Sequence, residues 1–107
     1  MRTIRELIES NDIENLEISL SSGTDVNAVY ENGLTALMIA CKKQSVEAVR
    51  VLLSFGADTL KKDDLGYTAK KIAYWVGEYR YGSYTKECEE IVNLIFNVQM
   101  KNRLVED

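Results

Sequence analysis

A 33-residue repeat is the feature of this sequence that most restricts its fold. When the chain is shifted by one such period against itself, Gly23 falls on Gly56 and Thr35 falls on Thr68. Apolar positions on either side of these markers also match, because Leu20 falls on Leu53 and Ile39 falls on Ile72. A fixed period of this length indicates a stack of similar helical units, because each unit can bury its apolar face only against a neighbour. The 107 residues of the chain leave room for about three such units.

The middle unit, residues 33–58, has the clearest pattern and predicts two short helices joined by a tight turn. Apolar residues recur at helical spacing over residues 35–43. Ser45 then stands where a side-chain oxygen can accept a hydrogen bond from an early backbone N–H of the second helix. In that second helix, Leu52 and Leu53 belong to one apolar stripe, and we expect both to be buried between the repeats.

These motifs resemble those of the ankyrin repeat family. Residues 35–40, Thr-Ala-Leu-Met-Ile-Ala, are similar to its T-P-L-H-x-A signature, and residues 49–58 are similar to its V-x-x-L-L-x-x-G-A-D pattern. The resemblance implies an all-α ankyrin-repeat stack of about three helix-turn-helix units with N- and C-terminal capping repeats. We expect one domain over residues 1–107, with repeats at about 1–32, 33–65 and 66–97 and a C-terminal helix extending to about 104.

The two outer units depart from the pattern of the middle one. In the first unit, Thr3 and Glu6 fit a capping box and Asp12 is placed to cap a second helix. In the third unit, Lys70 stands where the middle unit has an apolar residue, which suits a half-exposed end of a stack. The repeat register is lost after residue 73, and the extra residues fall in the aromatic-rich stretch 74–84.

The residue types argue against catalysis. The chain contains no histidine, so neither a Ser–His nor a Cys–His pair can form. Cys41 and Cys88 are far apart in sequence and lie on apolar helical faces, which favours buried, reduced thiols over a redox role or a zinc site. The adjacent acids Asp63 and Asp64 are typical of a solvated turn. We therefore predict that the protein is not an enzyme and binds no metal or cofactor.

Charge and hydrophobicity narrow the classes of partner. The net charge of −4 argues against general nucleic-acid binding, although residues 35–75 are locally basic and could face an acidic patch on a partner. A well-mixed solvated surface is the alternative interpretation. No apolar run approaches the roughly 18 residues of a membrane span, and the N-terminus does not resemble a signal peptide. We expect a soluble, cytoplasmic protein that is a monomer on its own.

The family resemblance implies that the chain binds another protein through its turn tips and a concave groove lined by the first helix of each repeat. Carried over position by position, the expected partner-binding residues are Glu31, Leu34, Lys42, Lys43, Lys62, Asp64, Tyr67, Trp75, Tyr79 and Tyr81.

Two alternatives accompany this prediction. The aromatic cluster at residues 74–84 would also suit a lid on the core, and Lys42 and Lys43 would also complement a helix C-terminus. A different function, a cytosolic inhibitor such as an immunity protein that neutralises a bacterial toxin enzyme, is suggested by the small size and acidic charge of the chain.

Overall fold

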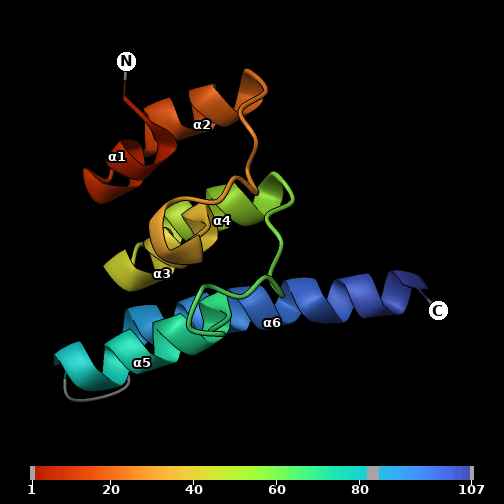
Figure 1. Cartoon of the computed structure of the whole chain (residues 1–107). Coiled ribbons are helices and arrows are strands. Elements are labelled where there is room, and N and C mark those ends of the chain that lie inside the picture. The colour runs from red at the N-terminus through yellow and green to blue at the C-terminus, as the bar shows by residue number, and fades with distance from the viewer. Residues whose placement is uncertain (1, 82–84, 107) are drawn as a thin grey trace.

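Three stacked pairs of α-helices make up the computed structural model, which describes the backbone of residues 2–81 and 85–106 and the side chains of residues 2–77 and 85–102 (Figure 1). The helices are α1 (Ile4–Glu9), α2 (Ile13–Ser21), α3 (Ala36–Lys43), α4 (Val46–Ser54), α5 (Ala69–Tyr81) and α6 (Lys86–Glu106), with a short 3-10 turn η1 (Glu31–Gly33) before α3. The inner helices α1, α3 and α5 pack on one another in that order, and the outer helices α2, α4 and α6 do the same.

The helix starts lie where the sequence predicted them. The backbone N–H of Glu6 donates to the Thr3 hydroxyl at 3.2 Å, and the Glu6 carboxylate accepts from the Thr3 N–H at 3.3 Å, which completes the capping box of α1. Asp12 caps α2 by accepting from Asn15 N–H at 3.3 Å. Ser45 caps α4 in the same way. Each cap satisfies a donor that a helix leaves open at its first turn.

The third pair of helices is longer than the second. Helices α5 and α6 span 13 and 21 residues, whereas α3 and α4 span 8 and 9. In the second pair, Gln44 takes a left-handed conformation (φ 58°) that ends α3. Gly77, at the equivalent position of the next repeat, stays inside α5. Much of the extra sequence therefore lengthens a helix, and α6 runs on to Glu106.

The core is centred on the middle repeat. Every residue of α3 from Ala36 to Cys41 is buried, and so are Val49 and Leu52 of α4. The prediction for Leu53 was wrong, because its side chain is only half-buried. It lies on the side of α4 that faces α6, where it lines a hollow with Leu94 and Val98 rather than entering the core.

The hairpins that precede α3 and α5 contact each other through their tips. An antiparallel bridge between Val29 and Thr35 closes the first hairpin. The Asp64 N–H of the second hairpin donates to the Asn32 carbonyl of the first at 3.0 Å. Gly33 has a φ of +74°, and a β-carbon there would lie 2.5 Å from the Asp64 carboxylate. Glycine is therefore required at this position both by its backbone conformation and by the close approach of the second tip.

Both cysteines lie in the core, as the sequence predicted. The Cys41 and Cys88 side chains are buried, and the Cys88 thiol donates to the Ala73 carbonyl at 3.2 Å. Burial raises the pKa of each thiol above its ordinary value. Both therefore favour the unreactive thiol over the thiolate.

Within the part of the chain that the structure describes, none of the helices has the length and hydrophobicity needed to cross a membrane.

Because Leu52 is buried and Leu53 is only half-buried, truncating each to alanine should lower the free energy of unfolding by different amounts. Leu52→Ala should lower the free energy of unfolding by about 2–5 kcal/mol, because it opens a cavity between repeats. Leu53→Ala should cost clearly less, and Leu60→Ala, at an exposed loop position, about 0.5 kcal/mol or less. Urea unfolding followed by circular dichroism measures all three. Equal costs for Leu52 and Leu53 would contradict the packing described for α4.

The contact between hairpin tips predicts a difference between two equivalent glycines. Gly66 is the counterpart of Gly33 in the next repeat and also has a positive φ, +86°, but a β-carbon there would meet nothing within 4 Å. Alanine at either position should cost about 1–2 kcal/mol from the left-handed backbone. Gly33→Ala should cost more than Gly66→Ala, because it also displaces Asp64. Equal free energies of unfolding for the two variants would show that the tips are not in contact.

The thiols should be protected by the fold. Ellman's reagent should label neither Cys41 nor Cys88 in the native protein, and both should react once guanidinium unfolds the chain. Rapid labelling of either thiol under native conditions would show that the core opens around it and would restore the redox alternative.

Candidate protein-binding surface

The surface predicted to bind a partner is formed by the two hairpin tips and by the inner helices α1, α3 and α5. Residues one repeat period apart occupy equivalent positions on neighbouring repeats, so the register gives the order of side chains along this surface. Its two ends differ in charge and in side-chain type.

At the first-repeat end, the charged groups pair with one another. Glu31 is exposed on the first hairpin, and its carboxylate lies 3.6 Å from the Arg5 guanidinium of α1. Arg5 also lies 3.8 Å from Glu9, one helical turn further on. Glu31 is thus exposed, and its charge is opposed by Arg5, which the sequence analysis did not identify. The Glu9 pairing could have been found from the i, i+4 spacing.

At the third-repeat end, aromatic and cationic side chains come together. Tyr67 is half-buried, and the Lys71 ammonium lies 5.5 Å from the centre of its ring. Trp75 follows one turn later on α5 and is 52% exposed. We call Tyr67, Lys71 and Trp75 the aromatic end. A cation–π interaction thus holds the Lys71 ammonium over the Tyr67 ring. The sequence analysis missed this pair, although residues spaced i, i+4 on a helix are expected to be neighbours.

The backbone fixes the start of the aromatic end. Tyr67 N–H donates to the Asp63 carboxylate at 2.8 Å, and Asp63 N–H donates to the Tyr67 carbonyl at 3.0 Å. The same Asp63 oxygen accepts from Leu65 N–H at 3.0 Å. Asp63 therefore orders the hairpin internally, as an aspartate in a turn does.

Not all of the lysines predicted to bind a partner lie on the surface formed by the hairpin tips and the inner helices. Lys42 precedes Trp75 by one repeat period, so the two occupy equivalent positions on adjacent inner helices. Lys62 and Asp64 are exposed on the second hairpin, and Asp64 lies against the first tip. Lys43 instead lines a hollow with Gln44, Thr85 and Glu87, beside the turn between α3 and α4.

Of the three remaining predicted residues, only one has a side chain that the structure describes. Leu34 was expected on the partner surface, but it is only 7% exposed and belongs to the core, so this prediction is corrected. The Tyr30 N–H donates to the Leu34 carbonyl at 2.7 Å within the closed hairpin, and the Leu34 side chain packs inward. The side chains of Tyr79 and Tyr81 lie outside the described residues.

No group of three or more histidine, cysteine or carboxylate side chains that could hold a metal ion occurs among the described residues. The surface offers aromatic contact area, paired charges and exposed lysines. These groups suit recognition of another macromolecule by contact.

Known proteins are similar to this chain over most or part of its length. A protein of Caenorhabditis elegans, an ankyrin repeat and LEM domain-containing protein 1 homolog, is 44% identical over 54 residues, which are 50% of this chain and 8% of that protein. Human mitochondrial disaggregase is 38% identical over 65 residues, 61% of this chain and 9% of that protein. Human transient receptor potential cation channel subfamily A member 1 is 32% identical over 93 residues, 86% of this chain and 8% of that protein. This chain thus spans about a tenth or less of these relatives.

A solved structure shares the fold, and a family model shares the repeat pattern. The crystal structure of the human ASB11 ankyrin repeat domain superposes with a TM-score of 0.73 at 21% identity, and the match covers 92% of this chain and 40% of that one. The family described as ankyrin repeats (3 copies) matches residues 4–102. Taken with the 33-residue period, this match shows that the chain belongs to the ankyrin repeat family.

Proposed function

We propose that this chain is a protein-interaction module that binds a partner through its hairpin tips and inner helices, with the aromatic end as the anchor. Ankyrin repeat domains are generally protein–protein interaction modules. The choice of anchor rests on one observation. Trp75 is 52% exposed and lies on the same face of the third repeat as the Tyr67–Lys71 pair. Large aromatic side chains at such positions dominate the energetics of many interfaces.

The charges favour a partner with an acidic patch. At the first-repeat end, Arg5 is already opposed by Glu9 and Glu31. Near the aromatic end, Lys42 and Lys71 are exposed. A cationic rim around apolar anchors raises the association rate with an acidic partner and helps to select it. The cytoplasmic location and the absence of catalytic activity remain predictions, and the inhibitor alternative is suggested by the sequence alone, without support from the structure or from the similar proteins.

A comparison of variants tests the role of Trp75. The chain is immobilised, exposed to lysate of its host, and the captured proteins are quantified by mass spectrometry. A specific partner should be captured by the wild type and depleted roughly 30-fold by Trp75→Ala, since a hot spot contributes about 2 kcal/mol or more. Phe96→Ala is the matched control, because this aromatic residue is 49% exposed on α6, a different helix. It should capture the same partner as the wild type.

The charges are tested with the partner so identified. Lys42→Glu combined with Lys71→Glu should slow association and weaken its dependence on salt, as measured by surface plasmon resonance. Melting temperatures are measured beside the binding. If Trp75→Ala unfolds the chain, or if it captures the partner as well as the wild type does, the aromatic end is not the anchor and the proposal fails.

A further inference from the structure

The outer face of the stack carries a hollow that is separate from the aromatic end. It has a volume of about 330 Å³, is open to solvent, and lies between α4 and α6, the outer helices of the second and third repeats. Because it lies between two described repeats, a repeat added to either end of the stack would not cover it. Its apolar side chains are Leu53, Leu94 and Val98, and its polar side chains are Arg50, Ser54, Asn97 and Lys101.

The groove between the preceding pair of outer helices, α2 and α4, is closed at the corresponding place. Leu20 of α2 is the counterpart of Leu53, one repeat period earlier. Leu20 is only 5% exposed, whereas Leu53 is half-buried. The second groove thus leaves accessible an apolar side chain that the first groove buries.

The size of one side chain on each groove accounts for part of this difference. The buried residues Val49 and Leu52 of α4 correspond to Val92 and Ile95 of α6, which are also buried. In this alignment Phe55, directly after α4, corresponds to Val98, which borders the hollow. The second groove therefore has a smaller apolar side chain where the first has an aromatic one, and α6 continues beyond this point (Figure 1). An apolar side chain from another molecule can fill the missing volume.

The polar groups of the hollow differ between its two ends. At one end, the Arg50 guanidinium lies 3.9 Å from the Glu90 carboxylate, which opposes its charge. The Ser54 hydroxyl donates to the Val51 carbonyl at 2.6 Å. At the other end, Lys101 is exposed and forms no ion pair with any residue that the structure describes. The positive charge of Lys101 is therefore unmatched.

Nearby carboxylates do not balance Lys101. The positions one helical turn from it are 97, 98, 104 and 105, and none of them is charged. Glu90 is eleven residues earlier on α6, which is about 16 Å along the helix axis. Glu47 and Glu87 line a separate hollow beside the turn between α3 and α4. The hollow thus changes from a neutral pair at one end to a free cation at the other.

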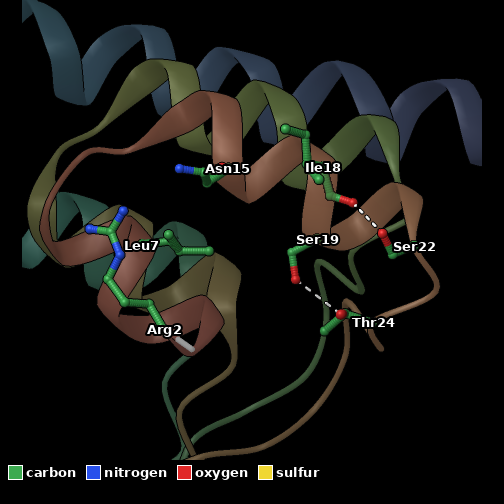
Figure 2. A pocket seen from close by; sticks show the side chains of 7 residues that line it. All are labelled: Arg2, Leu7, Asn15, Ile18, Ser19, Ser22 and Thr24. Carbon is green, nitrogen blue, oxygen red and sulfur yellow. Dashed lines mark hydrogen bonds between the residues drawn. The ribbon is translucent and has the colours of Figure 1, made fainter.

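A second hollow, of about 470 Å³ between α1 and α2, lacks this feature (Figure 2). The charged side chain among the described residues that line it is Arg2, and Arg2 forms an ion pair with Asp12. The Ser19 and Thr24 hydroxyls lie 3.0 Å apart, and the Ser22 hydroxyl donates to a backbone carbonyl of α2. Its polar groups are therefore engaged with one another and offer no free charge to select a partner.

We propose that the hollow between α4 and α6 binds an amphipathic helix of a partner protein, which carries a large apolar side chain and, toward Lys101, a carboxylate. The apolar side chain fills the space bounded by Leu53, Leu94 and Val98, as anchors do when a helix lies in a groove. The carboxylate pairs with Lys101, which steers association and selects the partner. An open hollow suits a protein segment better than a small molecule, which is usually enclosed. This site does not depend on the function proposed for the aromatic end.

A phage-displayed library of helical peptides is the probe for this site. The library is first depleted on immobilised Val98→Phe and then selected on the wild type. Val98→Phe introduces the larger side chain that the first groove has at the equivalent position, so it fills the hollow. Peptides enriched on the wild type should carry leucine or phenylalanine within about one helical turn of aspartate or glutamate, because Val98 and Lys101 are one turn apart.

The enriched peptide is then synthesised and titrated by fluorescence anisotropy. Val98→Phe should weaken its binding roughly 10-fold or more, because the apolar anchor is excluded. Lys101→Glu should weaken it about 3-fold, as expected for an exposed ion pair. Lys101→Glu should also prefer a peptide in which lysine replaces the acid, which a merely structural effect would not produce. Met100→Phe is the matched control, since it adds an aromatic side chain to another stripe of α6, and it should bind as the wild type does.

Other outcomes would overturn the proposal. Enriched peptides without acidic residues would contradict the role of Lys101, and equal binding by Val98→Phe would place the peptide elsewhere. Weaker binding by Trp75→Ala would assign the peptide to the aromatic end. A wild-type dimer that Val98→Phe abolishes would show that a second copy occupies the hollow instead. Melting temperatures are measured for each variant, and Ser54→Phe, on the exposed rim of α4, replaces Val98→Phe if the latter does not fold.

Discussion

Burial of the middle repeat between its two neighbours is the interaction on which the rest of the structure depends. Helix α3 has six consecutive buried residues, Ala36–Cys41, which is possible only because α1 covers one side and α5 the other. A fully buried leucine such as Leu37 or Leu52 contributes about 1.5–3 kcal/mol, whereas a domain of this kind is stable by only about 5–15 kcal/mol in total. The outer repeats have a neighbour on one side only, so they depend on the middle repeat for their cores.

The features set by local chemistry could be predicted from the sequence. The capping box of Thr3 and Glu6 and the caps at Asp12 and Ser45 depend on residues within one helical turn, and all are present. The repeat period and the burial of most of its apolar stripe also follow from the pattern, because a stack repeats the same environment. Gly56 has a positive φ just after α4, a conformation that glycine adopts readily at the end of a helix.

The features that depend on distant contacts could not be predicted. Leu34 faces the core because the bridge between Val29 and Thr35 folds the hairpin, and no nearby residue indicates this. Leu53 belongs to the same apolar stripe as Leu52, but its side chain lies against α6. The sequence of α6 departs from the 33-residue period, so this contact could not be read from the repeat. For the candidate surface, the sequence supplied Tyr67 and Trp75, while Lys71 and Arg5 were recognised only from their contacts. The concave groove stays a prediction, and the difference in charge between the two ends of the inner face depends on the contact of Arg5 with Glu31.

Native-state hydrogen exchange tests the dependence on the middle repeat most directly. We expect the amides of α3 and α4 to exchange only through global unfolding, with protection equal to the free energy of unfolding measured in urea. The amides of α1, α2 and the C-terminal half of α6 should exchange earlier through local opening. If α1 or the end of α6 were protected as strongly as α3, or if α3 exchanged first, the middle repeat would not be the element that holds the stack together.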